Sequence, residues 1–340
     1  MESLVLEPTA VRALAPADLD SVVAIDATIE GRSRRGYIER RLQAARREPT
    51  LHAQFAAVDE RGIAGYLLAR VLEGEFGRGD RELRIELVGV RADLRGDGTG
   101  SRLFDALSTW SARHAVRALR TQSSWRDHRM LGWLDRRGFS LAPAQVLECI
   151  VDTEAWSPER DDAMGAADPD GAATEIDFGR HDANDFERAG RGGADVRSMT
   201  AADLADIVAI DHRVTGRDRT AYLRGRLEEA LDDSTLRVSL AARRDGVLAG
   251  FLMARADHGD FGRTEPVAVL DTIGVDPAQL RHGVARALVS QLFANLSALR
   301  IERVETVVTP DDDALAAFLH AMGFVPSQRL GFVRAIEPAS

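Results

Sequence analysis

The sequence predicts an α/β protein of two similar domains, each with a mixed central sheet flanked by helices. Two observations predict this class. The chain of 340 residues repeats itself at a constant offset of 185 residues. Within each copy, strand patterns come early and then alternate with helical patterns, as in a layered α/β fold. Each copy spans about 145 residues, a normal size for a domain.

The repeat keeps one register without a gap from Arg12 to Phe139. The matched positions include Arg12 with Arg197, Ile25-Asp26 with Ile210-Asp211, Gly65 with Gly250, and Gly138-Phe139 with Gly323-Phe324. We therefore expect an N-terminal domain over 1–153 and a C-terminal domain over 195–340. Residues 154–194 have no partner in the repeat and are rich in Asp, Ala and Gly, which is typical of a linker.

Periodicity predicts the elements of the first copy, and the second copy repeats them. Apolar positions at helical spacing indicate helices, and alternating or continuous apolar runs bounded by turn residues indicate strands. The expected elements are a helix over 18–30, a short helix ending near 42, strands over 55–58, 64–72 and 83–90, a helix after 100, a strand over 118–123, a helix over 129–137 and a closing strand over 145–151.

Composition excludes several classes of function. A net charge of -10 without a basic block argues against nucleic acid as the main ligand. No apolar run is long enough for a membrane span, and the N-terminus lacks the pattern of a secretory signal. The single cysteine, Cys149, allows no intramolecular disulfide, which fits a cytoplasmic protein. No grouping of His, Cys, Asp and Glu has metal-ligand spacing, so we expect no metal.

A glycine-rich stretch between a strand and a helix is the most informative motif. An apolar run over 85–90 leads into Arg95-Gly96-Asp97-Gly98-Thr99-Gly100, and a helical pattern follows. Glycines leave backbone N–H groups unobstructed, and these groups with the helix dipole form an anion site suited to a diphosphate. The structural alternative is a tight strand-to-helix connection. The second copy repeats the stretch as Arg281-His282-Gly283-Val284-Ala285, with Leu280 in place of Arg95.

The order Arg-x-x-Gly-x-Gly after a hydrophobic strand resembles the acetyl-coenzyme A loop of the GNAT N-acetyltransferases, here in tandem. The resemblance covers about 280 of the 340 residues. It implies two GNAT domains that bind coenzyme A through the loop amides, with the pantetheine arm along the preceding strand. The residues implied to bind the cofactor are Val88, Val90, Arg95, Gly96, Asp97, Gly98, Thr99 and Gly100, and in the second copy Ile273, Val275, Arg281, His282, Gly283, Val284 and Ala285.

The resemblance also points to Glu86, and to Asp271 in the second copy, as the general base that deprotonates the amine. A carboxylate in an apolar strand tends to have a raised pKa. The alternatives are an ion pair or a solvent-facing strand residue. The tyrosine that usually serves as general acid is absent, because Leu134 and Leu319 occupy its position.

Polar residues near Leu134 and Leu319 could take part in the chemistry, but each also has a structural interpretation. His128 and His320 could act as acids but fit surface histidines better, and Asp127 and Asp312 fit helix N-caps.

A repeated Gly-Arg-x-Arg-x-x-Tyr stretch is the candidate acceptor site. It comprises Arg32, Arg34 and Tyr37, repeated as Arg217, Arg219 and Tyr222. Arginine forks bind carboxylate or phosphate, which favours an amine acceptor with an anionic group. The structural alternative is a set of ion pairs with neighbouring acidic residues.

We therefore expect an acetyl-coenzyme A-dependent N-acetyltransferase that acts on a small-molecule or peptide amine by direct attack. We expect no nucleic acid or membrane partner, and a monomer or homodimer. The alternative function is a catalytically degenerate pair of domains that senses acyl-coenzyme A.

Overall fold

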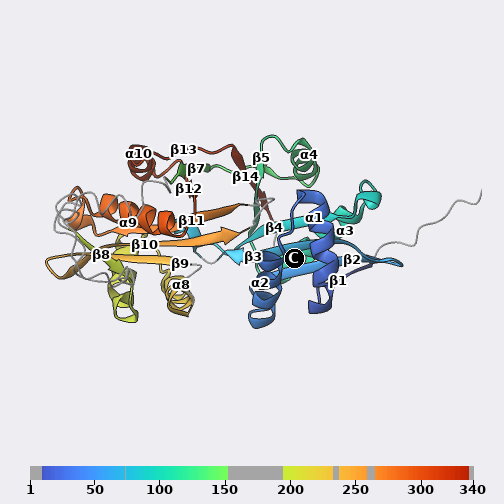
Figure 1. Cartoon of the computed structure of the whole chain (residues 1–340), viewed down its shortest axis with the longest axis horizontal. Coiled ribbons are helices and arrows are strands. Elements are labelled where there is room, and N and C mark those ends of the chain that lie inside the picture. Colours follow the sequence, from blue (N-terminus) through green and yellow to red (C-terminus); the bar gives the residue numbers. More distant parts are fainter. Residues whose placement is uncertain (1–9, 73, 152–193, 233–236, 259–264, 337–340) are drawn as a thin grey trace, which may run out of the picture.

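The computed structural model of the protein describes residues 10–72, 74–151, 194–232, 237–258 and 265–336. Two seven-stranded sheets lie side by side along the long axis of the molecule, each with its own helices (Figure 1). We call residues 10–151 the N-terminal half and residues 194–336 the C-terminal half. The expected linker lies outside the described residues except for Ala194.

The expected α/β elements are present in both halves. The N-terminal half contains β1 (Ala10–Ala13), α1 (Leu19–Glu30), α2 (Arg35–Arg47), β2 (His52–Asp59), β3 (Gly62–Leu72), β4 (Glu82–Val90), α3 (Thr99–Arg113), β5 (Ala118–Ser124), α4 (His128–Arg136), β6 (Ser140–Leu141) and β7 (Gln145–Ile150). The C-terminal half contains β8 (Asp195–Ser198), α7 (Leu204–Thr215), α8 (Thr220–Asp232), β9 (Arg237–Arg244), β10 (Val247–His258), β11 (Pro266–Val275), α9 (Val284–Ala298), β12 (Arg303–Val308), α10 (Asp313–Ala321), β13 (Val325–Pro326) and β14 (Arg329–Ala335).

Helices cover both faces of the N-terminal sheet. Alternate side chains of β3 point to opposite faces, as the period of a strand requires. Tyr66 and Leu68 pack with α1 and α2, and Leu67 and Ala69 pack with α3 and α4. The strands β4 and β5 are parallel and the other pairs are antiparallel, so the sheet is mixed as expected.

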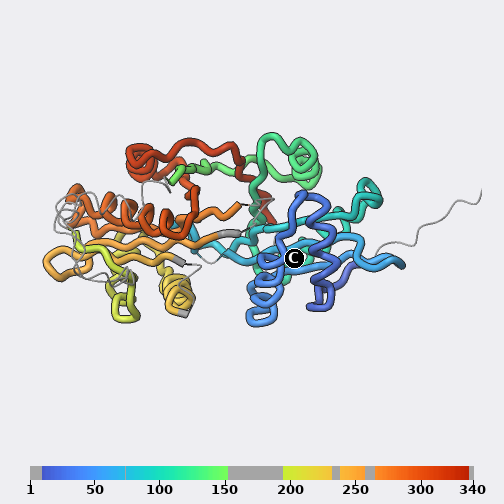
Figure 2. The backbone as a smooth tube through the Cα atoms, viewed as in Figure 1, coloured from blue at the N-terminus to red at the C-terminus, as the bar shows by residue number. Residues whose placement is uncertain are grey.

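The closing strands are exchanged between the two halves. The N-terminal sheet has the order β1-β2-β3-β4-β5-β14-β6, and the C-terminal sheet has the order β13-β7-β12-β11-β10-β9-β8. β14 thus pairs with β5, from Arg329 opposite Ser124 to Ala335 opposite Ala118, and β7 pairs with β12. In Figure 2 the red C-terminal segment crosses to the blue-green half, and the green segment crosses the other way.

The strand expected over 145–151 therefore forms, but it closes the sheet of the other half. Leu147 of β7 and Phe332 of β14 occupy equivalent positions of the repeat. Leu147 is fully buried with Cys149 and Val304 in the core of the C-terminal half, whereas Phe332 lies in the core around Phe104 of the N-terminal half. Both strands place a large apolar side chain at this position, and each packs in the core of the opposite half.

Candidate functional site

A β-bulge marks the same position in both halves. In the pairing of β3 with β4, Leu68 lies opposite Leu87 and Ala69 lies opposite Ile85, so Glu86 is the extra residue. In the pairing of β10 with β11, Asp271 is skipped in the same way. Bulges bend a strand and redirect its side chains, and they are frequent beside active sites. The two candidate bases thus sit where each central strand bends.

Beyond the bulge, β4 separates from its parallel neighbour. The described pairing of β4 with β5 covers only Glu82–Arg84, and the hydroxyl of Thr121 then donates to the carbonyl of Ile85 at 3.3 Å. The edge of β4 that carries Val88 and Val90 is therefore open toward β5. An extended chain can add to such an edge as a further strand.

The C-terminal half repeats this geometry. The described pairing of β11 with β12 ends at Val269, and Thr306 donates to the carbonyl of Leu270 at 2.8 Å. Ile273 and Val275 hold the places of Val88 and Val90.

The glycine-rich loops have the same backbone conformation in both halves. Gly96 and Gly98 have φ angles of 102° and 82°, and Gly98 is the residue that precedes α3. The C-terminal half has Arg281 at φ 65° and Gly283 at φ 78° before α9. Left-handed backbone is costly for a residue with a side chain, so Arg281 adopts a conformation that Gly96 adopts freely.

Two further differences separate the loops. The exposed Arg95 donates its Nε to the carbonyl of Val90 at 3.2 Å, and Leu280 at its place has no such donor. A Cβ on Gly100 would lie 3.3 Å from Nε1 of Trp133, and the C-terminal half carries Ala285 there.

A large cleft follows the open edge of β4 in the N-terminal half. Its volume is about 570 Å³. The lining includes Val88, Gly89 and Val90 of β4, Arg95, Gly96, Gly98 and Gly100 of the loop, Thr28 and Ile29 of α1, and Asp127, Met130, Trp133 and Arg137 around α4. The cleft therefore joins the expected cofactor residues Val88, Val90, Arg95, Gly96, Gly98 and Gly100 in one surface. Thr99, which begins α3, is buried and does not line the cleft, and Asp97 is exposed on the loop.

Glu86 is enclosed by arginines. It is 0% exposed, and its Oε1 accepts from Nε of Arg70 at 2.9 Å and lies 3.1 Å from Nη2 of Arg41. Its Oε2 has no hydrogen-bond partner among the described residues. The ion pair that the sequence left open as an alternative is thus present.

His52 adjoins this cluster. Burial lowers the pKa of His52 to about 4, partly opposed by Glu86 and reinforced by Arg41 and Arg70. The imidazole is therefore neutral at pH 7.

Asp271 has a similar environment, and the N-terminal half contributes to it. Asp271 lies 3.4 Å from Nη1 of Arg255, the equivalent of Arg70. Glu75, on the loop before β4, is 2% exposed and accepts from Nη1 of Arg70 at 2.8 Å. Burial raises the pKa of Glu75, but Arg70, Arg226 and Arg255 outweigh it and hold the pKa well below its usual range.

Arg34 and Arg219 are committed to buried ion pairs. Nε of Arg34 donates to Asp26 at 2.9 Å, and the hydroxyl of Tyr66 donates to the same carboxylate at 2.5 Å. Nη1 of Arg219 donates to Asp211 at 2.7 Å, the equivalent pair. These contacts match the structural alternative for the second arginine of each stretch.

The other residues of the acceptor stretch differ in exposure. Tyr37 and Tyr222 are buried, at 4% and 3%. Arg217 is exposed and donates to the carbonyl of Gly77 in the N-terminal half at 2.8 Å. Arg32 is exposed beside the end of α1.

The positions expected for a general acid hold core or surface residues. Leu134 and Leu319 are buried at 1% and 0%. His128 is exposed, and His320 lies near the carbonyl of Phe324 at 2.9 Å. Asp127 and Asp312 are N-caps, as expected, and accept from the backbone of Met130 at 3.0 Å and Leu315 at 3.1 Å.

The sequence did not point to Glu30, the last residue of α1, which does not itself line the cleft. It follows Thr28 and Ile29, which line the cleft, and its side chain is 22% exposed. Burial raises the pKa of Glu30. The positive charge of Arg34 lowers this pKa in part, and the negative charges of Asp26 and Asp127 raise it further. The one available signal was a mismatch in the repeat, where Thr215 stands at the equivalent position.

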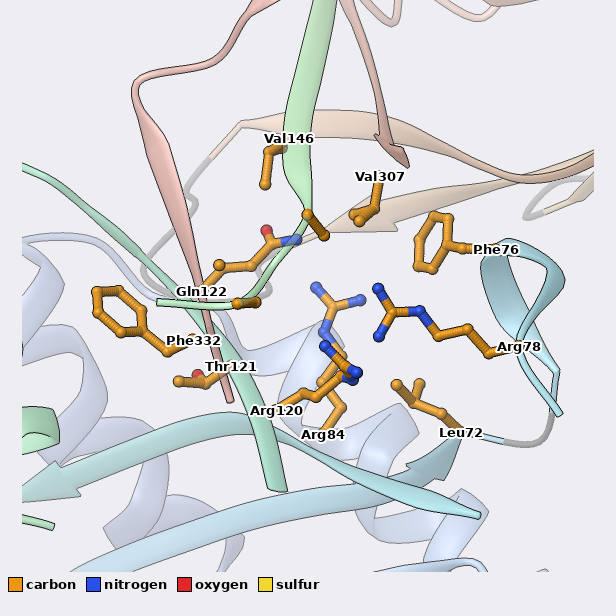
Figure 3. A pocket seen from close by; sticks show the side chains of 13 residues that line it. Leu72, Phe76, Arg78, Arg84, Arg120, Thr121, Gln122, Val146, Val307 and Phe332 are labelled. Carbon is orange, nitrogen blue, oxygen red and sulfur yellow. The ribbon is translucent and has the colours of Figure 1, made fainter. Parts of the chain in front are cut away.

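A second, much smaller pocket of about 40 Å³ lies where the exchanged strands meet. Figure 3 shows Arg78, Arg84 and Arg120 pointing toward one another beneath Val146 and Val307. Glu82 accepts from Nη2 of Arg120 at 2.8 Å and from Nη1 of Arg78 at 3.4 Å. The carboxylate offsets part of this positive charge, and we interpret the pocket as part of the junction between the halves.

The described residues also bear on metal sites and membrane spans. They contain no group of three or more His, Cys, Asp or Glu that could hold a metal ion. None of the helices described is both long and apolar enough to cross a membrane.

The chain resembles known proteins in sequence pattern and in fold. The family described as "Acetyltransferase (GNAT) family" matches residues 21–139 and 202–324. None of the curated proteins matches the chain at a significant level.

Several solved structures share the fold. A tandem GNAT protein from the clavulanic acid biosynthesis pathway has a TM-score of 0.62 and 16% identity, and the match covers 97% of this chain and 99% of that one. A GCN5-related N-acetyltransferase from Sphaerobacter thermophilus has a TM-score of 0.56 and 16% identity, covering 97% and 96%.

A glucosamine N-acetyltransferase region in a fungal multi-domain β-N-acetylglucosaminidase has a TM-score of 0.62 and 15% identity, and the match covers 97% of this chain. This chain spans 39% of that protein. At these identities the likeness shows the fold alone. The match to the family covers both copies of the repeat, and the two mixed sheets, the bulged central strands and the paired glycine loops agree with it. The chain therefore belongs to the GNAT family of acetyltransferases, as a tandem pair of GNAT domains.

Proposed function

We propose that the N-terminal half binds acetyl-coenzyme A in the cleft along β4 and transfers the acetyl group to a primary amine by direct attack. The open edge of β4 from the bulge to Val90, continuous with the glycine loop, is the observation that carries this proposal. When bound, acetyl-coenzyme A supplies an acyl group activated as a thioester.

The chain's own groups fit that ligand. Backbone N–H groups of Val88 and Val90 stand at an unpaired strand edge, where they can hold an extended amide chain and polarise a carbonyl. The loop from Arg95 to Gly100 ends at the N-terminus of α3, which favours a diphosphate.

The C-terminal half keeps the bulge and the open edge, but it replaces Arg95 by Leu280 and Gly96 by Arg281. Arg281, His282, Gly283, Val284 and Ala285 form its loop. We propose that this half binds the cofactor more weakly. Glu86 and Asp271 stay the candidate bases on the strands, each buried beside an arginine.

The acceptor is a small-molecule or peptide amine. Among the arginines of the two acceptor stretches, Arg32 is exposed next to the cleft-lining end of α1. An anionic group on the acceptor would pair with it.

The test is calorimetric titration of acetyl-coenzyme A into the wild type and three variants. Gly98→Glu puts a negative charge in the diphosphate path, so we expect affinity to fall more than tenfold, or about 1.4 kcal/mol. Gly98→Ala is the matched control for backbone strain, because a Cβ there meets only Nη1 of Arg102 at 3.5 Å within 4 Å. Gly283→Glu makes the same change in the C-terminal half.

Unchanged binding in Gly98→Glu would refute the N-terminal site. Release of free coenzyme A in the presence of a panel of amines then tests transfer. Tight binding without release for any amine would favour the alternative, an acyl-coenzyme A sensor.

A further inference from the structure

Three arginines meet in the small pocket at the junction of the two halves. Arg84 of β4 and Arg120 of β5 lie opposite each other on paired strands, and Arg78 reaches the pocket from the loop before β4 (Figure 3). Like charges that lie directly opposite on neighbouring strands destabilise a sheet. Val269 and Glu305 form the equivalent pair of the C-terminal half, so the fold itself does not require two arginines here.

The three guanidinium groups are largely withdrawn from solvent. Arg84 is 6% exposed, and the side chains of Arg78 and Arg120 are 15% and 21% exposed. Nε of Arg78 is buried and has no hydrogen-bond partner among the described residues. A buried donor without a partner costs free energy, and an acceptor that enters from solution removes this cost.

Carboxylates balance only part of the positive charge. Glu82 accepts from Arg120 at 2.8 Å and from Arg78 at 3.4 Å, and Glu305 lines an adjoining pocket together with Arg84. Three guanidinium groups thus face two carboxylates among these described residues, which leaves a surplus of one positive charge. The pKa of Arg78 is lowered first by burial and then by the charge of Arg120, and Glu82 opposes this in part.

The remaining walls of the pocket are mostly apolar, and they come from both halves. They include the side chains of Leu72, Phe76, Val146, Val307 and Phe332 (Figure 3). The volume of about 40 Å³ has room for about three water molecules or one small ion of similar size. A planar carboxylate matches the forked donors of arginine, and a short apolar tail matches these walls.

We propose that this pocket binds a small monocarboxylate, whose charged group pairs with Arg78 and whose short tail contacts the apolar walls. The pocket and the cleft along β4 share no lining residue among those described, so the site is separate from the proposed acetyl transfer. Val146 belongs to β7 and Phe332 to β14. A bound carboxylate therefore touches both exchanged strands and stabilises the folded junction.

The experiment titrates sodium acetate and sodium butyrate into the full-length protein at constant ionic strength, with sodium chloride and sodium phosphate as comparison anions. Calorimetry measures binding, and thermal unfolding measures stabilisation. We expect saturable binding of the carboxylates and a higher unfolding temperature, with weaker effects of chloride, which cannot use the forked donors, and of phosphate, which has no apolar part. Arg78→Gln should weaken carboxylate binding about tenfold or more.

Glu82→Gln removes a carboxylate that competes for the same guanidinium groups. It should strengthen carboxylate binding several-fold, a gain that a merely destabilised protein would not show. Arg46→Gln, at an exposed position near the end of α2, is the control for the loss of one positive charge and should bind like the wild type. Circular dichroism checks that each variant is folded, and Arg78→Gln carries the test if Glu82→Gln is not.

Three results would overturn the proposal. The first is the absence of saturable carboxylate binding by the wild type, and the second is an equal effect of all the anions. The third is unchanged affinity in a folded Arg78→Gln variant. A preference for phosphate over the carboxylates would reject the assigned class of ligand.

Discussion

Replacing Phe332 by alanine should weaken the N-terminal half, although Phe332 belongs to β14, the last strand that the structure describes. Phe332 is 8% exposed and packs in the core that contains Phe104 and Leu119. Truncating a buried phenylalanine typically costs about 3–5 kcal/mol. A loss of about 3 kcal/mol corresponds to a roughly 100-fold increase in the opening equilibrium.

Hydrogen exchange read peptide by peptide is the assay, because it reports opening of separate regions. In Phe332→Ala we expect protection to fall about 100-fold in β5, which pairs with β14. Leu147→Ala is the matched control at the equivalent position of the repeat. It is 0% exposed in the core of the C-terminal half, so its protection loss should appear in β12. Loss confined to β12 in Phe332→Ala would refute the strand exchange.

Two further predictions concern buried charge. The pKa of His52 is lowered from 6.5 to about 4 in the folded chain. Between pH 6.5 and pH 4 the imidazole therefore binds a proton in the unfolded chain but not in the folded one, and the free energy of unfolding decreases as pH falls through this range. His52→Gln should reduce this loss by on the order of 3 kcal/mol. The measurement is the midpoint of denaturant unfolding at pH 7 and at pH 4, and an identical pH dependence in the variant and the wild type would contradict the prediction. The second prediction concerns the buried ion pair: Asp26→Asn leaves Arg34 buried beside a neutral group and should cost about 3–5 kcal/mol of unfolding free energy. Thermal or denaturant unfolding measures this, and a change below 1 kcal/mol would show that the pair is not stabilising.

Much of the fold could be predicted because its signals are local. The spacing of Leu103, Phe104 and Leu107 predicts the buried face of α3. The repeat predicts that Gly98 and Gly283 take the same left-handed conformation directly before a helix. The exchange of closing strands could not be predicted, since Leu147 and Phe332 are apolar residues at equivalent positions and their type alone does not say which sheet each strand joins. The environment of Glu30 depends on Asp127 and Arg329, which only the folded chain brings near it.

Because of the exchange, each half supplies a strand that completes the sheet of the other half. β6 reaches the N-terminal sheet only through β14, so a separately produced segment of residues 1–153 would lack the strand between β5 and β6. It would present an unpaired edge of β5, a surface that invites aggregation. A chain cut between residues 152 and 193 would behave differently, because its two pieces already share both sheets and would stay together as a non-covalent pair. A protein with a single copy and the same strand path could complete its sheet only with a strand from a second molecule, so the tandem chain is equivalent to a strand-swapped dimer made permanent by fusion.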